Sequence, residues 1–299
     1  MLVCLFAGSA QASFVTNWIP FELARGHISI PVTLNGKPST AIFDTGASGN
    51  GIAKAFLIQN PDSYRKGRQI VVQGVYGRER VHLADRINVV MFGVNFTIDE
   101  LMPMSLGQHG FMIGLPFFEE FVVQIDYGNE RMRLASRDVI DLRKLANVKM
   151  KRASGSAHPM VRVRFNDESS MWMTLDTGNT GGFVMKRFDA TKHDWLERFG
   201  TTEILAKGAT GQRRSMDEFR LPSIEVGPFT VENVRVMVPA EGVKTNIAKD
   251  DASNWRRTVG NRQSSGLLGY DLLRHFVVTI DFKRNLLHLE PAPEITSQR

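Results

Sequence analysis

The sequence predicts a mainly β protein made of two similar halves, and three observations support this. Many segments alternate apolar with polar residues between turn residues, whereas windows with helical periodicity are few. The tripeptide Asp-Thr-Gly occurs at Asp44 and again 132 residues later at Asp176, each time after an apolar run. The block FVVQID at residues 121–126 recurs as FVVTID at residues 276–281. A duplicated, strand-rich unit is therefore expected, and 299 residues are enough for two cores.

A β-hairpin is expected before each of the two aspartates. In the first copy, a strand at residues 28–34 is followed by Asn-Gly, a strong tight-turn signal, and by a returning strand that ends at Asp44. In the second copy, residues 161–165 alternate with period two, a polar turn follows, and the returning strand ends at Asp176. Each half is therefore expected to contain a β-hairpin whose second strand ends at an aspartate.

Two further elements repeat downstream of each aspartate. The Gly-x-x-Gly pattern of residues 74–77 recurs at residues 208–211, and each copy is expected to form a hairpin tip. An apolar-apolar-Gly sequence follows at residues 112–114 and at residues 267–269, and a helix of at most two turns is expected after each. The second copy has about 23 additional residues, which fit a surface loop within residues 239–265.

The repeat divides the chain into an N-terminal lobe at residues 13–140, a linker at 141–158 and a C-terminal lobe at 159–299. Residues 1–12 are apolar and end in Ala-Gln-Ala, which resembles the cleavage site of a secretory signal peptide. The alternative for that segment is a buried first strand. The signal interpretation predicts an exported protein, either periplasmic or secreted.

The composition excludes several classes of partner. The formal net charge is +6, but the basic residues are dispersed and no aromatic platform accompanies them, so a solvated surface is preferred to a nucleic-acid site. No segment after the first reaches the roughly 18 to 20 apolar residues of a transmembrane helix, and stable membrane insertion is not expected. Because Cys4 is the only cysteine, no disulfide is expected.

The paired tripeptides and their matched surroundings resemble the aspartic proteases of the pepsin and retropepsin-like group. The closest likeness is to single-chain, two-lobed members of the bacterial type. The resemblance implies two retropepsin-like β-barrel lobes related by a pseudo-twofold axis, with Asp44 and Asp176 as the catalytic pair in the cleft between them. In that family each lobe supplies one Asp-Thr-Gly-x-Ser/Thr loop, and Ser48 and Thr180 complete the two copies here.

The loop residues each have an expected physical role. Glycine permits close backbone approach and turn conformations closed to other residues. The resemblance implies that the two threonines interlock across the interface, and the hydroxyls of Ser48 and Thr180 are expected to donate hydrogen bonds to the outer carboxylate oxygens. The loop residues expected to support the carboxylates are Thr45, Gly46, Ser48, Thr177, Gly178 and Thr180.

Two carboxylates within hydrogen-bonding distance cannot both ionise easily, and the aspartic protease pair is the standard example. One member then acts as a base toward a bound water, and the protonated member donates a hydrogen bond to the scissile carbonyl. The resemblance also implies that the hairpin of Gly74, Tyr76 and Gly77 is a flap over the substrate. The alternative for this hairpin is an ordinary exposed turn.

Competing chemistries have little support in the sequence. Ser48 misses the Gly-x-Ser-x-Gly pattern by one residue, and none of the seven histidines has metal-ligand spacing, so neither a metal nor a cofactor is expected. The predicted function is an aspartic endopeptidase that acts on a peptide or protein substrate as a monomer. The alternative is a catalytically silent peptide-binding or scaffolding protein with the same fold.

Overall fold

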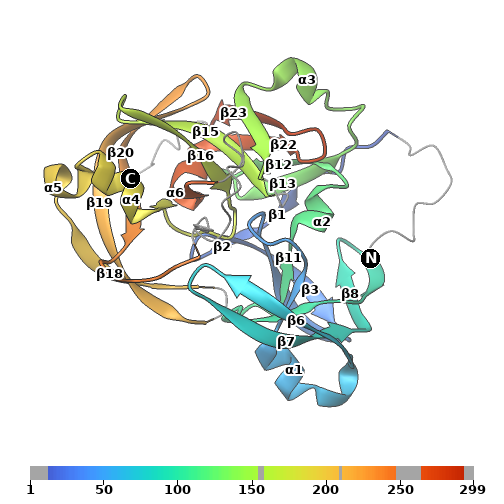
Figure 1. Cartoon of the computed structure of the whole chain (residues 1–299). Helices are drawn as coiled ribbons and strands as arrows, with labels where there is room; N and C mark the ends of the chain where they lie inside the picture. The colour runs from blue at the N-terminus through green and yellow to red at the C-terminus, as the bar shows by residue number, and fades with distance from the viewer. Residues whose placement is uncertain (1–12, 154–157, 209–210, 247–263, 293–299) are drawn as a thin grey trace, which may run out of the picture.

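The computed structural model describes residues 13–153, 158–208, 211–246 and 264–292, and within these ranges the chain is mainly β (Figure 1). The expected signal peptide at residues 1–12 lies outside the described residues, as does most of the expected surface loop. No helix in the described ranges has the length and apolar character needed to cross a membrane.

The first half of the chain contains thirteen of the strands, and its helices are short. The strands are β1 (Ile19–Pro20), β2 (Glu22–Ala24), β3 (His27–Leu34), β4 (Lys37–Phe43), β5 (Gly51–Ala53), β6 (Arg65–Gly74), β7 (Gly77–Asp85), β8 (Ile87–Met91), β9 (Val94–Ile98), β10 (Met102–Met104), β11 (Phe111–Ile113), β12 (Val122–Asp126) and β13 (Arg131–Ala135). The helices are α1 (Lys54–Gln59), the 3-10 helix η1 (Pro61–Ser63) and α2 (Leu115–Phe118).

The second half has fewer but longer strands. They are β14 (Val148–Arg152), β15 (Pro159–Phe165), β16 (Ser169–Leu175), β17 (Phe183–Met185), β18 (Thr202–Lys207), β19 (Arg213–Val226), β20 (Phe229–Pro239), β21 (Gly266–Leu268), β22 (Phe276–Asp281) and β23 (Leu286–Pro291). The helices are α3 (Leu142–Leu145), α4 (Arg187–Lys192), α5 (Trp195–Phe199) and α6 (Tyr270–Leu273).

Both predicted hairpins form. Strands β3 and β4 pair antiparallel, and the Asn35-Gly36 turn between them has both residues at positive φ, as a two-residue hairpin turn requires. Strands β15 and β16 pair in the same way, with Asn166 and Asp167 at positive φ in their turn. Each returning strand ends immediately before an aspartate of the repeat.

The two halves share a pattern of strand pairing around each aspartate. Strand β11 runs parallel to β4 and antiparallel to β5, and β21 in the same way runs parallel to β16 and antiparallel to β17. The short helices α2 and α6 begin one residue after Gly114 and Gly269, close to their expected starts. The repeated apolar-Gly segments therefore lie beside the strands that carry the aspartates.

Strand β12 contains the FVVQID block except Phe121, β22 contains the whole FVVTID block, and these two strands pair antiparallel with each other. Gln124 lies directly opposite Thr279, its counterpart in the repeat, and its Nε2 donates a hydrogen bond of 2.9 Å to the threonine hydroxyl. Figure 1 shows strands of both halves gathered here. The duplicated segments therefore join the two halves within one sheet.

Part of the expected linker is folded. Residues 141–158 contain α3 and β14, and β14 pairs with β15 on one side and with β23 on the other. Val148 is buried, whereas the charged residues between the apolar positions remain accessible. The alternation within this charged stretch therefore builds a strand that extends the shared sheet. Residues 154–157 lie outside the described residues.

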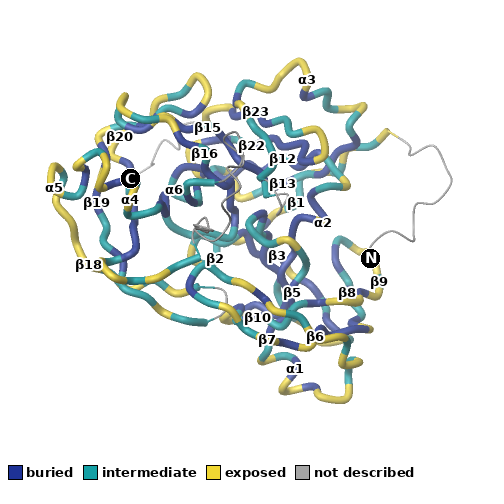
Figure 2. Tube along the Cα trace, in the orientation of Figure 1, coloured by how far each residue is buried: buried dark blue, intermediate teal, exposed yellow. Residues whose placement is uncertain are grey.

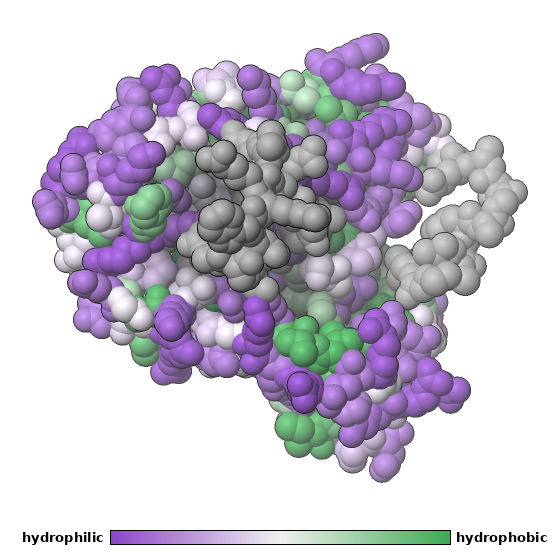
Figure 3. All heavy atoms as spheres, viewed as in Figure 1, coloured by the Kyte–Doolittle hydropathy of each residue, from purple (hydrophilic) through white to green (hydrophobic). Residues whose placement is uncertain are grey.

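A common apolar core contains side chains from both halves, and Figure 2 shows its buried positions along the central strands. The ring of Phe118, in α2, packs 5.9 Å from that of Phe43 and 5.2 Å from that of Phe282 in the second half. Each buried phenylalanine of this kind contributes about 1.5–3 kcal/mol. The face in Figure 3 is largely hydrophilic, with smaller apolar areas.

Candidate active site

Asp44 and Asp176 occupy equivalent positions at the ends of β4 and β16. The backbone N–H of Asp44 donates to the carbonyl of Ile113, and that of Asp176 donates to the carbonyl of Leu268, both at 2.9 Å. These acceptors belong to the repeated apolar-Gly segments. Strands β11 and β21 therefore hold the two aspartates in the same way.

The loops after the aspartates rest on the turns that follow β11 and β21. Ala47 accepts a hydrogen bond from the N–H of Leu115, and Asn179 accepts one from the N–H of Tyr270, both at 2.9 Å. A Cβ on Gly269 would lie 2.4 Å from the carbonyl oxygen of Asn179. Only glycine permits this approach, so close packing explains why glycine ends this segment in both copies of the repeat.

Two threonines interlock the aspartate loops. The N–H of Thr45 donates to Oγ1 of Thr177 at 3.1 Å, and the N–H of Thr177 donates to Oγ1 of Thr45 at 3.0 Å. Each hydroxyl in turn donates across the interface, from Thr45 to the carbonyl of Leu175 (2.7 Å) and from Thr177 to that of Phe43 (2.9 Å). Both threonines are buried, so water does not compete for these four bonds.

The interlock brings the two carboxyl groups close together, and each affects the pKa of the other. Each glycine of the repeat lies against the carboxyl of the opposite half. A Cβ on Gly46 would be 2.6 Å from Cγ of Asp176, and one on Gly178 would be 2.4 Å from Cγ of Asp44. No larger residue fits at either glycine while the carboxyls keep these positions.

Backbone donors orient both carboxylates. Oδ1 of Asp44 accepts the N–H of Gly46 at 2.8 Å, and Oδ1 of Asp176 accepts those of Gly178 at 2.9 Å and Asn179 at 3.1 Å. The side chain of Asn179 instead bonds within its own loop, donating to the carbonyl of Gly182 at 2.8 Å. It therefore shapes the second loop and has no hydrogen bond with either carboxyl.

Burial raises the pKa of both carboxyls above the ordinary aspartate value. For Asp176 the negative charge of Asp44 adds to burial and raises its pKa further, to well above that value. For Asp44 the hydrogen bonds from Asp176 and from the backbone N–H of Gly46 partly offset the effect of burial. Both pKa values are therefore raised, that of Asp176 more than that of Asp44.

Ser48 and Thr180 do not act as expected. Ser48 is exposed, and within the described part of the chain neither hydroxyl donates to a carboxylate. The backbone N–H groups of the two glycines occupy the carboxylate oxygens instead. Thr180 packs against the tight turn before β3, where a Cβ on Gly26 would lie 3.1 Å from Cβ of Thr180.

The sequence analysis missed a histidine beside the carboxyl pair. His27 interacts electrostatically with Asp44 and with the backbone of Gly178, and its ring lies 6.0 Å from that of His109. Burial, followed by the charge of His109, lowers the pKa of His27, while Asp44 acts in the opposite direction. The register of the first hairpin could have identified this histidine, because continuing the pairing by two residues places residue 27 opposite residue 44.

The second residue missed is Tyr127, which follows β12 and is buried. Burial raises the pKa of its phenol, and the charges of Tyr270 and Asp176 act in the same direction. Its ring lies 5.8 Å from that of Tyr270. The phenol therefore stays un-ionised beside the second aspartate.

The hairpin of β6 and β7 turns at Val75 and Tyr76, between Gly74 and Gly77. Tyr76 is buried and packs in a cluster with Val184, Met216 and Met237 of the second half. The N–H and side-chain Nδ2 of Asn246 donate to the carbonyls of Val75 and Gly74, at 2.6 and 2.8 Å. The tip therefore reaches the second half and is not an ordinary exposed turn. In the second Gly-x-x-Gly element, residues 209–210 lie outside the described residues.

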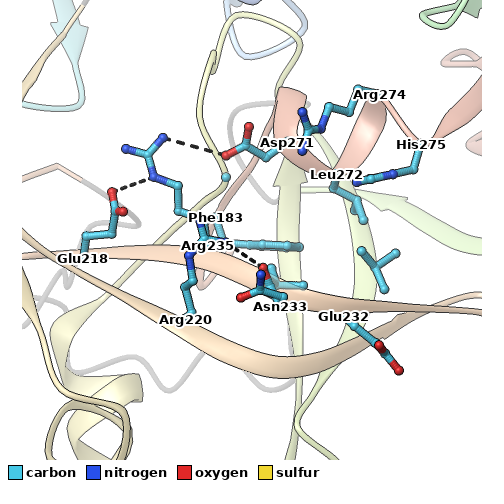
Figure 4. Close-up of a pocket in the computed structure, with 13 residues that line it drawn as sticks. Phe183, Glu218, Arg220, Glu232, Asn233, Arg235, Asp271, Leu272, Arg274 and His275 are labelled. Carbon is cyan, nitrogen blue, oxygen red and sulfur yellow. Dashed lines mark hydrogen bonds and ion pairs between the residues drawn. The ribbon is translucent and has the colours of Figure 1, made fainter. Parts of the chain in front are cut away.

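A separate cavity of about 380 Å³ lies between β19, β20 and α6 (Figure 4). Arg235 lines this cavity, where its Nε pairs with Oε2 of Glu218 at 2.5 Å and its Nη1 lies 3.8 Å from Oδ2 of Asp271. Neither Asp44 nor Asp176 lines it. Among the residues that the structure describes, no group of three or more acidic, histidine or cysteine side chains could hold a metal ion.

A comparison with known protein families finds a match in the second half of the chain. Residues 161–272 match the model of a family described as aspartyl protease. The match runs from β15 to α6 and includes Asp176 with its loop, whereas Asp44 precedes it. No curated protein matches the chain. The chain is thus mainly β, and its residues 161–272 are similar to an aspartyl protease domain.

Proposed function

We propose that the chain is an aspartic endopeptidase whose two halves are lobes related by a pseudo-twofold axis, with Asp44 and Asp176 as its catalytic pair. The close approach of these carboxyls, held by the reciprocal Thr45–Thr177 bonds, is the observation that supports the proposal most strongly. The repeated strand pairing around each aspartate supports the twofold relationship. The matched family model supports protease activity in general.

In the proposed mechanism the ionised Asp44 takes a proton from a water held between the carboxyls, and that water attacks the scissile carbonyl carbon. Asp176 donates its proton to the carbonyl oxygen as the tetrahedral intermediate forms. As the intermediate collapses, a hydroxyl proton returns to Asp176, the nitrogen receives the proton held by Asp44, and the C–N bond breaks. No covalent intermediate with the protein is required.

The substrate of the proposed enzyme is an extended peptide segment, bound under the hairpin that carries Gly74, Tyr76 and Gly77. Contacts from the second half to this hairpin support a role as flap, because a segment that bridges both halves can close over what lies between them. The sequence of residues 1–12 supports export, and a complete pair of aspartate loops in one chain supports action as a monomer.

The test is cleavage of a diverse peptide library by the full chain across a wide pH range, with Asp44→Asn and Asp176→Asn alongside. Each variant is expected to lose at least about 10²–10⁴-fold in rate, because each removes one proton-transfer group. Asp62→Asn, at an exposed position in η1, is the control and should keep full activity. Full activity in either variant of the pair would refute the assignment. Binding of peptides without cleavage by the wild type would favour a silent binding protein.

A further inference from the structure

One histidine reaches the carboxyl pair from the strand opposite the first aspartate. Strand β3 begins at His27, and the register of β3 with β4, in which Ser29 faces Ile42, places His27 opposite Asp44 when it is extended by two residues. Residues that face each other across an antiparallel pair project to the same side of the sheet. The imidazole and the carboxyl therefore lie on the same side, as their electrostatic interaction indicates.

The turn before His27 presses against the second aspartate loop. Arg25 and Gly26 both have positive φ, at 55° and 87°, and join β2 to β3 in a two-residue turn. A Cβ on Gly26 would lie 3.1 Å from both Cβ and the carbonyl oxygen of Thr180. The turn thus brings His27 to the backbone of Gly178, with which the imidazole also interacts. His27 therefore contacts both halves of the site.

A second histidine limits what His27 can do. His109 is buried, its ring lies 6.0 Å from that of His27, and its Nδ1 is 2.9 Å from the hydroxyl of Thr40. Burial lowers the pKa of His109, and a charge there lowers the pKa of His27. The titratable groups around His27 are thus His109 and the carboxyl pair, while Arg25 is exposed in the same turn.

The second half has a histidine at the equivalent place, but it has no such interaction. The register of β15 with β16, in which Met160 faces Thr174, places His158 opposite Asp176. Nε2 of His158 is buried and has no hydrogen-bond partner in the described part of the chain, and no interaction with Asp176 accompanies it. A histidine therefore acts on the pair from the first half alone.

We propose that His27 is a positioning residue for the carboxyl pair: its imidazole, when protonated, holds the negative charge on Asp44 and so keeps the shared proton on Asp176. The inference rests on the proposed function for its effect on catalysis, but the interaction itself does not. A positive charge beside Asp44 favours its ionised form, and the effect is larger where water is excluded. His27, a residue of the first half, would thus make Asp44 the base and Asp176 the acid.

The catalytic test is the pH dependence of kcat/KM in His27→Gln, a variant that keeps a side-chain N–H but cannot carry charge. The acidic limb reports the carboxylate that must be ionised, and it should move to higher pH by about one unit when the positive charge is lost. KM at the pH optimum should change little. His158→Gln is the matched control and should leave the limb in place. An unchanged limb in His27→Gln would overturn the proposal.

A measurement that needs no activity separates this inference from the proposed function. The imidazole of His27 is titrated by NMR in the wild type, in Asp44→Asn and in Asp176→Asn. Loss of the Asp44 charge should lower the midpoint of His27, and the shift should exceed that in Asp176→Asn. Equal midpoints in the wild type and Asp44→Asn would refute the inference even for an active protease. A shifted midpoint in a chain that cleaves no peptide would support the interaction and refute the proposed function.

Discussion

Thr45 and Thr177 lie on equivalent loops of the two halves, and each backbone N–H donates to the hydroxyl of the other. The hydroxyls then donate to the carbonyls of Leu175 and Phe43, so both N–H groups and both hydroxyls of this buried crossing have partners. The carboxyl pair depends on this crossing, because it fixes where each loop lies relative to the other. A single substitution at either threonine therefore tests the link between the two loops.

Thr45→Val should destabilise the protein by about 2–4 kcal/mol, because it leaves the N–H of Thr177 and the carbonyl of Leu175 buried without partners. Urea denaturation measures the change. Thr45→Ser keeps the hydroxyl and is the control, with a smaller loss expected. Equal losses for valine and serine would mean that packing of the methyl group matters and the hydrogen bonds do not.

Gly46→Ala and Gly178→Ala should each displace the carboxyl of the opposite aspartate, since the added Cβ would lie 2.6 Å from Cγ of Asp176 and 2.4 Å from that of Asp44. Overpacking of this kind costs about 1–3 kcal/mol, and the displaced pair should lose peptidase activity. Gly128→Ala is the control, because its Cβ would make only ordinary contacts, with Cβ of Ala292 at 3.6 Å and Oδ1 of Asp126 at 3.8 Å. Stability and cleavage are measured on the same preparations. Retention of full activity by either loop variant would contradict the close contact.

The sequence predicted those features that depend on residues near each other in the chain. The Asn35-Gly36 turn with alternating flanks predicted the first hairpin, and the repeated tripeptide predicted that Asp44 and Asp176 belong together. Strand β14 lies within the expected linker, where charged and small residues surround the buried Val148 and the alternation after it. Composition was the weaker guide there, and period-two alternation was the stronger one.

The features that the sequence did not predict depend on register and on distant contacts. A lone histidine is common, and His27 gains meaning only when the hairpin register places it opposite Asp44. Asn246 lies far along the chain from the tip that it binds, and no local pattern marks it. The roles expected for Ser48 and Thr180 depend on the shape of the loops, which no local pattern specifies. In the structure the backbone N–H groups of the loop glycines donate to Oδ1 of each carboxylate instead.

Arg137→Ala should destabilise the protein by about 3–5 kcal/mol, because Asp281 is almost fully buried and loses its nearest cation. Arg137 also donates to the carbonyl of Glu120 at 2.9 Å. Thermal or urea unfolding of the single variant is compared with that of Arg137→Ala/Asp281→Asn. The double variant should recover part of the loss, because it no longer buries a charge whose remaining cation, Arg284, is 3.7 Å away. No recovery would show that the lost packing of the arginine dominates.

Arg131→Ala is the matched comparison at the equivalent carboxylate of the first half. Arg131 is 40% exposed, and Asp126 keeps both hydrogen bonds from Asn129 after the arginine is removed. A partly exposed pair contributes at most about 1 kcal/mol, so this variant should lose much less than Arg137→Ala. Both aspartates are almost fully buried, so similar losses for the two arginines would contradict the view that the deeper burial of Arg137 sets the difference.

Tyr76→Ala should release the β6–β7 tip from the second half, because it removes the ring that packs with Val184, Met216 and Met237. Amide hydrogen exchange at residues 74–77 should become faster by at least about tenfold, as expected for the loss of 1.4 kcal/mol or more of local packing. Val71→Ala, at an exposed position of the same hairpin, is the control. Unchanged exchange in Tyr76→Ala would show that Asn246 alone holds the tip.

Asp176→Asn should make the protein more stable than the wild type, by an amount that grows as the pH rises. In the unfolded chain the carboxyl ionises at the ordinary aspartate value, whereas burial and the charge of Asp44 raise its pKa well above that value in the folded state. The folded state therefore binds this proton more tightly. The stability that the protonated group contributes is present below the unfolded pKa and is lost as the pH rises through the folded pKa.

Asparagine keeps an oxygen for the N–H groups of Gly178 and Asn179 and does not ionise, so the variant should not suffer this loss. Urea denaturation of both proteins from pH 4 to pH 8 should show their difference in stability widening by up to about 1.4 kcal/mol per pH unit within the window between the two pKa values. Asp44→Asn should widen less, because the hydrogen bond from Asp176 partly offsets the effect of burial on its pKa. A difference that stays constant with pH would mean that Asp176 ionises in the folded protein as it does in the unfolded chain, and a shared proton would then have no basis.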